Sequence, residues 1–420
     1  MAEEKRGLGD ELGALAHLIA AQALENPGAG SAQQLCTVAT GYFMKGEHET
    51  AARWYELALL LDPDLAIAHQ NLAAIHAEAG RSEEAQSCRD RAYRLQRVFV
   101  ESVEGAGETL RRVLILYAGG SPGNVPVETL LPTASCSRIK YAIDYAAEEE
   151  DGALPPYDLV FNAIGEPDVA APLAGRLERF AARCDRPLLN SPAAVMRTGR
   201  HLLPALLGDI EGVLVPPCLH FERAPASRAE LAGLLARAGV SLPLLSRPAA
   251  SHGGQELARS EDLATLEERL RAAGAGYLTQ FHDYRSADGH YRKYRMIFID
   301  REPLPYHLAV SAHWMVHYHS AGTGDDARWI AEERRFLEDP RAALGEAAMS
   351  ALAAIGSRLD LDYGGIDFSL LPDGRLLVFE ANATMLIHFE RGNGPLAHKN
   401  VHVQRIVDAF GRRLLRTGGS

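Results

Sequence analysis

The chain has 420 residues, a hydrophobic fraction of 47%, a charged fraction of 23% and a formal net charge of −12 at pH 7. One hydrophobic core stops growing at about 250–300 residues, so at least two domains are expected. The acidic balance argues against non-specific binding to nucleic acid or to anionic membranes, and a local basic pocket is compatible with it. The sequence contains no run of about 18 apolar residues, so no membrane span is predicted.

The start of the chain mixes charges, and residues 12–24 have the pattern of an amphipathic helix rather than of a signal peptide. The five cysteines are scattered without a CxxC pair, which favours free thiols in a reducing, cytoplasmic setting. A nucleophilic cysteine is the less favoured alternative, because none lies in a recognisable motif.

Small residues recur about 34 residues apart between positions 32 and 95. Gly46 and Gly80 are one such pair, and alanines at 39, 51 and 58 match those at 73, 85 and 92. Each unit is predicted to be a helix, a tight turn at the glycine and a second helix. This pattern resembles the tetratricopeptide repeat, which implies a surface for a peptide or protein partner. Packing on the next domain or dimerisation is the alternative, since two repeats are too few to stand alone.

An α/β layer is predicted next. Residues 113–117 and 157–163 have the pattern of buried parallel strands, and residues 173–184 that of a helix. Gly119, Gly120 and Gly123 follow the first strand, where a phosphate site is an alternative to a plain turn. Ser191 and Pro192 predict the start of a helix that carries Arg200.

The clearest motif is a predicted hairpin over residues 365–382, with Asp373–Gly374 at its turn. If Pro372 pairs with Arg375, then Asp367 lies directly opposite Glu380, and Asn382 points to the same face. The other face would be the apolar core side, made of Ile366, Phe368, Leu370, Leu377, Phe379 and Ala381. Two opposed carboxylates repel each other unless a cation lies between them. With the Asn382 oxygen they suit Mg²⁺, with Mn²⁺ as a second candidate; a solvated acidic face is the alternative.

Asp367 followed by Glu380–Ala381–Asn382 resembles the metal-binding end of ATP-grasp enzymes such as D-alanine–D-alanine ligase, glutathione synthetase and RimK-like ligases. The resemblance runs from about residue 113 to the end. It implies a fold class in which an all-α helical repeat precedes an α/β pre-ATP-grasp layer and an α+β ATP-grasp fold. The implied domains are residues 1–100, a linker at 101–111, the layer at 112–195 and the ATP-grasp domain at 196–420. The last would divide into a central part, about 210–285, and a metal-binding part, 286–420.

The resemblance also implies an ATP site. A strand ending at Arg247–Pro248 precedes a small-residue loop with Ser251, Gly253 and Gly254, whose N–H groups would bind phosphate. Arg247 stands where the family usually has lysine, and Arg200 similarly replaces an earlier lysine. Arginine can still bind phosphate.

Residues 277–284 resemble the strand that meets the adenine, with Gln280 and Phe281 beside the base and Asp283 at the ribose. Lys293 and Arg295 share one face of a strand over 291–300, and we expect both to neutralise charge during catalysis. A solvated strand edge is the alternative for these two cations.

Four histidines lie between residues 307 and 319. His313 and His317 have the i, i+4 spacing of a zinc site, but no Glu-x-x-His pattern supports it, so substrate contacts or packing are favoured. Residues 321–326 are expected to form a loop that closes over the site.

The expected function is an ATP-dependent carboxylate–amine ligase acting through an acyl phosphate, on a small-molecule or peptide carboxylate and an amine. A kinase-like phosphotransferase and a catalytically degenerate repeat scaffold are the alternatives. The resemblance is compatible with a homodimer, although the sequence leaves the oligomeric state open.

Overall fold

The computed structural model describes residues 11–25, 29–101, 110–120, 124–125, 127–249, 251, 254, 256–271, 273–316 and 326–416. Gly123, Gly253, His317, His319, residues 321–325 and most of the predicted linker lie outside these ranges. The chain divides into two compact units. The first comprises Met1–Phe99, Gly119–Ser121 and Lys140–Leu154, and the second comprises the remaining residues.

The first unit is mainly helical. Its described helices are α2 (Glu11–Glu25), α3 (Ala29–Met44), α4 (His48–Leu61), α5 (Ala66–Glu78) and α6 (Ser82–Leu95). α3 packs on α4 and α5 packs on α6. Gly46 and Gly80 have φ values of 78° and 75°, a backbone conformation that glycine adopts without steric cost. The predicted helix–turn–helix units are therefore present, while their identity as tetratricopeptide repeats remains a prediction.

In the glycine-rich turn that follows β2 (Arg111–Tyr117), the backbone amides bind a carboxylate of the protein itself. The amides of Gly119 and Gly120 donate to the two carboxylate oxygens of Asp144, at 3.0 and 3.2 Å. This pairing favours the plain turn over a phosphate site at this position, because the N–H groups are engaged.

A five-stranded sheet with the order β1-β3-β2-β4-β5 forms the predicted α/β layer. Its other strands are β1 (Val98–Glu101), β3 (Cys136–Ala142), β4 (Leu159–Asn162) and β5 (Leu188–Leu189). Strands β2, β4 and β5 pair in parallel, and the continuous apolar runs of β2 and β4 predict this arrangement. The helical segments of this region are α7 (Val127–Leu130), η1 (Glu148–Ala153), α8 (Pro167–Ala170), η2 (Ala171–Leu173), α9 (Ala174–Arg183), α10 (Pro192–Met196) and α11 (Leu203–Leu207).

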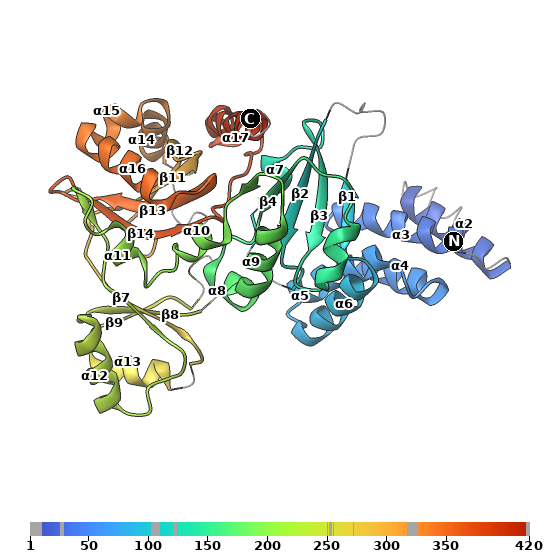
Figure 1. Ribbon diagram of the computed structural model, residues 1–420, viewed down its shortest axis with the longest axis horizontal. Coiled ribbons are helices and arrows are strands. Elements are labelled where there is room, and N and C mark those ends of the chain that lie inside the picture. Colours follow the sequence, from blue (N-terminus) through green and yellow to red (C-terminus); the bar gives the residue numbers. More distant parts are fainter. Residues whose placement is uncertain are drawn as a thin grey trace. The chain divides into compact units, whose positions relative to one another are not determined.

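Two further sheets complete the second unit (Figure 1). One has the order β7-β10-β8-β9 and consists of β7 (Cys218–Phe221), β8 (Leu244–Pro248), β9 (Ala258–Ser260) and β10 (Gly276–Gln280). Helices α12 (Arg228–Ala238) and α13 (Leu263–Leu270) pack on it through a leucine-rich core. Its three pairings are all antiparallel.

The other sheet has the order β12-β11-β13-β14-β6. Its strands are β6 (Val213–Leu214), β11 (Tyr291–Ile299), β12 (Glu302–Ser311), β13 (Tyr363–Leu370) and β14 (Leu376–Asn382). The helices α14 (Ala327–Glu338), α15 (Pro340–Leu344) and α16 (Glu346–Leu359) cover one face, and η4 (Ala397–Lys399) and α17 (Asn400–Arg416) end the described chain (Figure 1). The expected fold class is confirmed: helices, then a parallel α/β layer, then an α+β region.

Asn190 joins the parallel layer to this last sheet. It is fully buried, and its side-chain oxygen accepts from the amides of Asp362 and Tyr363 at 2.9 and 3.0 Å. In return, Asp362 accepts from the Asn190 amide at 2.7 Å. A shared core that includes Phe161, Tyr363 and Phe410 surrounds this contact. The layer and the sheet are therefore packed as one body within the second unit.

All five cysteines are free thiols, as the sequence predicts. Among the helices in the described part of the chain, none combines the length and apolarity needed to cross a bilayer.

Gly356 allows α16 to approach the sheet closely. A Cβ atom built there would lie 2.1 Å from the backbone oxygen of Arg301 and 2.8 Å from the Phe298 ring. We therefore predict that Gly356→Ala lowers the free energy of unfolding by about 3 kcal/mol, because helix and sheet must separate. The measurement is urea denaturation followed by circular dichroism.

Gly411→Ala is the matched control. Gly411 lies inside α17, and nothing lies within 4 Å of a Cβ added there. Alanine should stabilise this helix by ~1 kcal/mol through its lower conformational entropy in the unfolded chain. Equal stability of the two variants would contradict the close packing at Gly356.

Candidate active site

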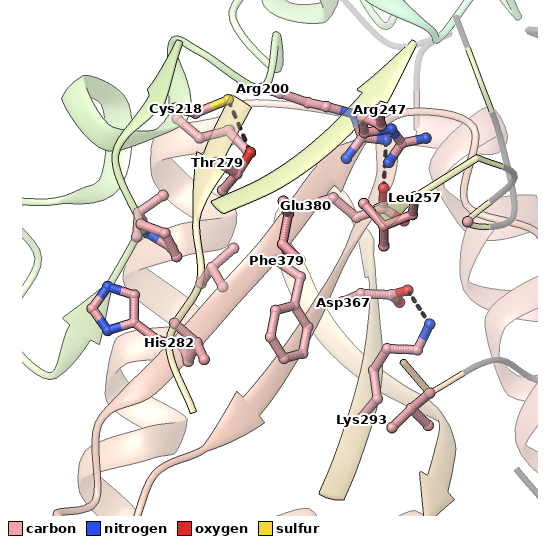
Figure 2. A pocket seen from close by; sticks show the side chains of 18 of the residues that line it. Arg200, Cys218, Arg247, Leu257, Thr279, His282, Lys293, Asp367, Phe379 and Glu380 are labelled. Atoms are coloured by element: carbon pink, nitrogen blue, oxygen red, sulfur yellow. Dashed lines mark hydrogen bonds and ion pairs between the residues drawn. The ribbon is translucent and has the colours of Figure 1, made fainter. Parts of the chain in front are cut away.

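A cavity of about 460 Å³ lies in the second unit and is lined by side chains from β7, β8, β10, β11, β13 and β14 and from the loops between them. Six charged residues line it: Arg200, Arg247, Lys293, Arg295, Asp367 and Glu380. Figure 2 shows Arg200 and Arg247 converging near Glu380, with Asp367 and Lys293 close by. The structure thus brings together most of the residues that the sequence singled out.

The two predicted carboxylates are direct cross-strand neighbours. Asp367 on β13 pairs with Glu380 on β14, and Gly365 pairs with Asn382. The exposed fractions of Asp367 and Asn382 are 2% and 9%. Like charges in this position destabilise a ladder, so each carboxylate must be compensated by another charge.

The register near the turn differs from the prediction. The Leu371 amide bonds to the Arg375 oxygen, and Phe368 pairs with Val378, one residue away from the expected pairing. A shift between Phe368 and Asp367 restores the expected register at the carboxylates, so Phe379 is the extra residue of a β-bulge.

The prediction that Leu377 and Phe379 lie on the core face of the hairpin is wrong, because the register differs and the strand has this bulge. Leu377 pairs with Ser369, which shares a face with Asp367, and both Leu377 and Phe379 line the cavity. They do not lie on the opposite core face, as simple alternation predicted. The cavity therefore has an apolar wall beside its charged end, and Figure 2 shows the Phe379 ring there.

Two cations from β11 compensate Asp367. Arg295 makes a bidentate pair with it, at 2.7 and 2.9 Å, and the Lys293 ammonium lies 3.2 Å away. Burial disfavours the charged carboxylate, but Arg295 and Lys293 outweigh that effect and hold the pKa of Asp367 well below its usual range. Asp367 is therefore ionised at neutral pH.

Arg200 compensates Glu380 through an ion pair of 2.6 Å. The sequence placed Arg200 on the helix that starts at Ser191, and the N-cap itself is confirmed by a hydrogen bond from Ala194. That helix, α10, ends at Met196, so Arg200 instead belongs to the turn before α11. Burial opposes its charge, but Glu380 outweighs this and raises the pKa of Arg200.

Arg247, at the end of β8, has no carboxylate partner within the described residues. Its guanidinium donates to the hydroxyl and backbone oxygen of Ser251, and burial together with Arg200 lowers its pKa. The lining of the cavity thus has four cations and two carboxylates, an excess of two positive charges. An anion is the natural ligand of such a site.

The other end of the cavity is mostly apolar and aromatic. Gln280, Phe281 and Gly254 line the cavity as expected. β10 ends at Gln280, earlier than predicted, and the exposed Asp283 caps the Arg285 amide at 3.1 Å rather than lining the cavity. The sequence reading did not single out several residues that also line it: Cys218, Thr279, His282, Trp314, Met385 and Leu386. Cys218 and Thr279 could not be assigned to the cavity from the sequence, because only the pairing of β7 with β10 brings them together.

The donors at the charged end fit a hard divalent cation. Asp367 and Glu380 offer carboxylate oxygens from opposite strands, and the Asn382 amide oxygen lies on the same ladder, where it now accepts from the Thr384 amide at 2.9 Å. Oxygen donors of this kind suit Mg²⁺. No cluster of three His, Cys, Asp or Glu side chains with metal-binding geometry occurs in the described ranges.

Neither a family model nor any curated protein matches this sequence. Several solved structures are similar to the chain. A VanG D-Ala:D-Ser ligase from Enterococcus faecalis is 12% identical, with 72% of this chain and 99% of that one covered and a TM-score of 0.43. A RimK domain ATP-grasp protein from Sphaerobacter thermophilus is 14% identical, with 71% and 98% covered and a TM-score of 0.41.

A carboxyaminoimidazole ribonucleotide synthase from Aspergillus clavatus, complexed with ATP, is 15% identical over 71% of this chain and 77% of that one, with a TM-score of 0.42. These similarities are remote.

His307, the first residue of the predicted histidine cluster, lies in a buried network outside the cavity lining. It hydrogen-bonds to Glu333, which also accepts from the Leu308 amide at 3.2 Å and lies 3.2 Å from His398. Burial lowers the pKa of His307 to about 4. Burial acts against ionisation of Glu333, but its histidine partners hold its pKa at about 2. His307 is thus a packing residue of the sheet.

This network predicts a loss of stability in acid. The unfolded chain has His and Glu pKa values of about 6.5 and 4.3, both above the folded values, so it takes up protons first as the pH falls. The stability contributed by His307 should decline from about pH 6.5 to 4, and that of Glu333 from about pH 4.3 to 2. Glu333→Gln should cost about 3 kcal/mol at pH 7 and flatten the lower part of this profile.

Urea denaturation at a series of pH values measures both effects. Glu338→Gln, on an exposed position of the same helix α14, is the control and should follow the wild-type profile. A Glu333→Gln profile that runs parallel to wild type below pH 4.3 would argue against the ionised buried carboxylate.

Proposed function

We propose that this protein is an ATP-dependent carboxylate–amine ligase that forms an amide or peptide bond through an acyl phosphate and releases ADP and phosphate. The observation that carries the proposal is the charged end of the cavity. Four cations converge there on two carboxylates that are direct neighbours across one hairpin. A site with excess positive charge beside oxygen donors for a divalent cation suits a polyphosphate bound with Mg²⁺ or Mn²⁺.

In this proposal, Asp367, Glu380 and Asn382 hold the metal ion, which supplies charge neutralisation at the phosphates. Arg200, Arg247 and Gly254 bind phosphate oxygens, with Ser251 orienting Arg247. Gln280, Phe281 and the apolar wall with Phe379 hold the base. Phosphate oxygens would compete with the carboxylates for Arg200, Lys293 and Arg295, so nucleotide binding would free the carboxylates for the metal ion.

The reaction has two steps. An oxygen of the substrate carboxylate attacks the γ-phosphorus, and the bond from that phosphorus to ADP breaks. An amine nitrogen then attacks the acyl carbon, phosphate leaves with the bonding electrons, and the nitrogen loses a proton. In this proposal Lys293 and Arg295, which both pair with Asp367, stabilise the charge that develops on the transferred phosphoryl group.

One observation favours a rival function. Both oxygens of Asp367 are occupied by Arg295, and Arg200 and Arg247 stand where related enzymes usually have lysine. A nucleotide-binding scaffold without turnover would tolerate this arrangement. A kinase-like enzyme would instead transfer phosphate to one stable product.

We extend the proposal to the first unit. Helices α2–α6 would bind a peptide or protein partner, and Leu15, Leu18, Met44, Leu60 and Ile67 are exposed there.

A test combines calorimetry with product analysis. Mg²⁺–ATP should bind to the purified protein, and ADP should form from a fractionated metabolite pool only when a carboxylate and an amine are both present. Hydroxylamine in place of the amine should convert the acyl phosphate into a hydroxamate that mass spectrometry detects. Glu380→Gln should reduce ADP formation by about 100-fold, because charge stabilisation at the phosphates is lost.

Glu268→Gln, an exposed position on α13, is the control and should retain full activity. A stable phosphorylated product formed without amine would identify a kinase-like enzyme. Mg²⁺–ATP binding without any ADP would identify a scaffold, and absence of nucleotide binding would remove both enzymatic proposals.

A further inference from the structure

Five residues next to Arg200 and Arg247 have no role in the proposed nucleotide site. Glu166 and Asp168 lie in the segment after β4, His201 follows Arg200, and His220 and Tyr277 lie on β7 and β10. We call these five residues the acidic–aromatic patch. The patch lies within the second unit, at the carboxyl end of a parallel strand, where α/β sheets commonly bind ligands.

The sheet register places the aromatic side of the patch beside the cavity. Thr279 lines the cavity, and Tyr277 is two residues earlier on β10, so the two side chains share a face. Tyr277 pairs with His220 on β7 and with Arg247 on β8. The rings of Tyr277 and His220 lie 4.9 Å apart, and those of His220 and His201 lie 5.4 Å apart. The rings thus continue the wall that begins at Arg247.

Glu166 is the unusual member of the patch. Its exposed fraction is 6%, yet no hydrogen bond or ion pair joins its side chain to the described residues. Its charged neighbours are Arg200, Glu380, Asp168 and Arg247. A buried carboxylate without a partner is costly, and burial accordingly raises the pKa of Glu166 to about 7. A ligand that supplies a positive charge would remove this cost.

The other members favour the same kind of ligand. Asp168 accepts a hydrogen bond of 2.5 Å from the Tyr277 hydroxyl, which fixes its carboxylate beside the rings. Burial and the neighbouring His220 lower the pKa of His201, so this imidazole is neutral and does not repel a cation. Neutral aromatic faces attract cations through the ring quadrupole.

Nucleotide binding would also change the net charge of the site in a way that favours a bound cation. The cavity lining has two positive charges in excess, and the two carboxylates of the patch offset them in the ligand-free protein. A nucleoside triphosphate carries more negative charge than one divalent metal ion neutralises, so it would use up the positive excess. Glu166, whose charged form Arg200 and Arg247 favour in the ligand-free protein, would then lose that compensation until another cation binds.

We propose that the acidic–aromatic patch binds a positively charged ammonium group of the co-substrate, so that the acceptor in the ligase reaction is a basic amine rather than a neutral or acidic one. The proposal rests on the proposed function, because it assigns the amine of that reaction. The contacts are ionic with Glu166 and Asp168 and cation–π with Tyr277 and His220.

The test uses saturation-transfer NMR on the full-length protein loaded with Mg²⁺ and a non-hydrolysable ATP analogue. The probes are putrescine, L-lysine and L-arginine, with glutarate as an anion of similar length. At least one of the cations should bind and glutarate should not. Glu166→Gln should weaken cation binding by about tenfold, because an ionic hydrogen bond is lost, and His220→Leu should weaken it about threefold.

Nucleotide affinity, measured on the same samples, separates this loss from misfolding. Glu166→Gln removes a negative charge near Arg200 and Arg247, so the ATP analogue should bind as tightly as before or more tightly, whereas a misfolded protein would lose both ligands. Glu178→Gln, an exposed position on α9, should change neither affinity.

The proposal is overturned if no cationic probe binds, if glutarate binds equally well, or if Glu166→Gln binds the cations as wild type does. If the nucleotide analogue does not bind to the wild-type protein, the proposed ligase function fails. The same titrations on nucleotide-free protein still decide whether the patch binds cations.

Discussion

Asp367 and Glu380 face each other across the β13–β14 ladder. Two carboxylates in this position repel each other, and the cations of the cavity offset that repulsion. Asp367 is buried and Glu380 is half-buried, and each pairs with its own arginine, Arg295 from β11 and Arg200 from the turn before α11. Among the described residues, removing Arg200 would leave Glu380 without an ion pair, whereas removing Arg295 would leave Asp367 with Lys293 alone. The ion pairs therefore hold the turn after α10 and the large sheet at a fixed distance. They also keep Arg200 and Arg295 in the cavity, where a polyphosphate would attract them.

The bulge at Phe379 gives the same hairpin a second role. By restoring the register at Glu380, it keeps the two carboxylates opposite each other, and it turns Leu377 and Phe379 into the cavity. One strand thus supplies the polar end and part of the apolar wall. The buried Asn190, bonded to Asp362 and Tyr363, anchors the start of β13 to the parallel layer, so the segment with Glu166 is held on a rigid support.

Much of the fold and part of the site could be predicted from local patterns. The hairpin at Asp373–Gly374, the buried run of β2 and the Ser191 N-cap depend on neighbours within a few residues, and all three are present. The extent of α10 could not be predicted, because the Thr198 hydroxyl bonds to the Val195 oxygen and the chain turns away before Arg200. Glu166 could not be recognised as a candidate site residue from the sequence. A single acidic residue after a strand is ordinary unless it is known to be buried.

The sequence by itself determined the order of helices and strands, the hairpin at Asp373–Gly374 and the excess of basic residues on β11, whereas the pairing of Asp367 with Glu380 also needed the bulge at Phe379. These follow from periodicity, turn chemistry and alternation, which act over short stretches of chain. Only the tertiary structure decided which cation meets which carboxylate, since Arg200 and Glu380 are 180 residues apart and Arg295 and Asp367 are 72 apart. Such pairs form because burial makes an uncompensated charge costly, and burial is a property of the folded chain.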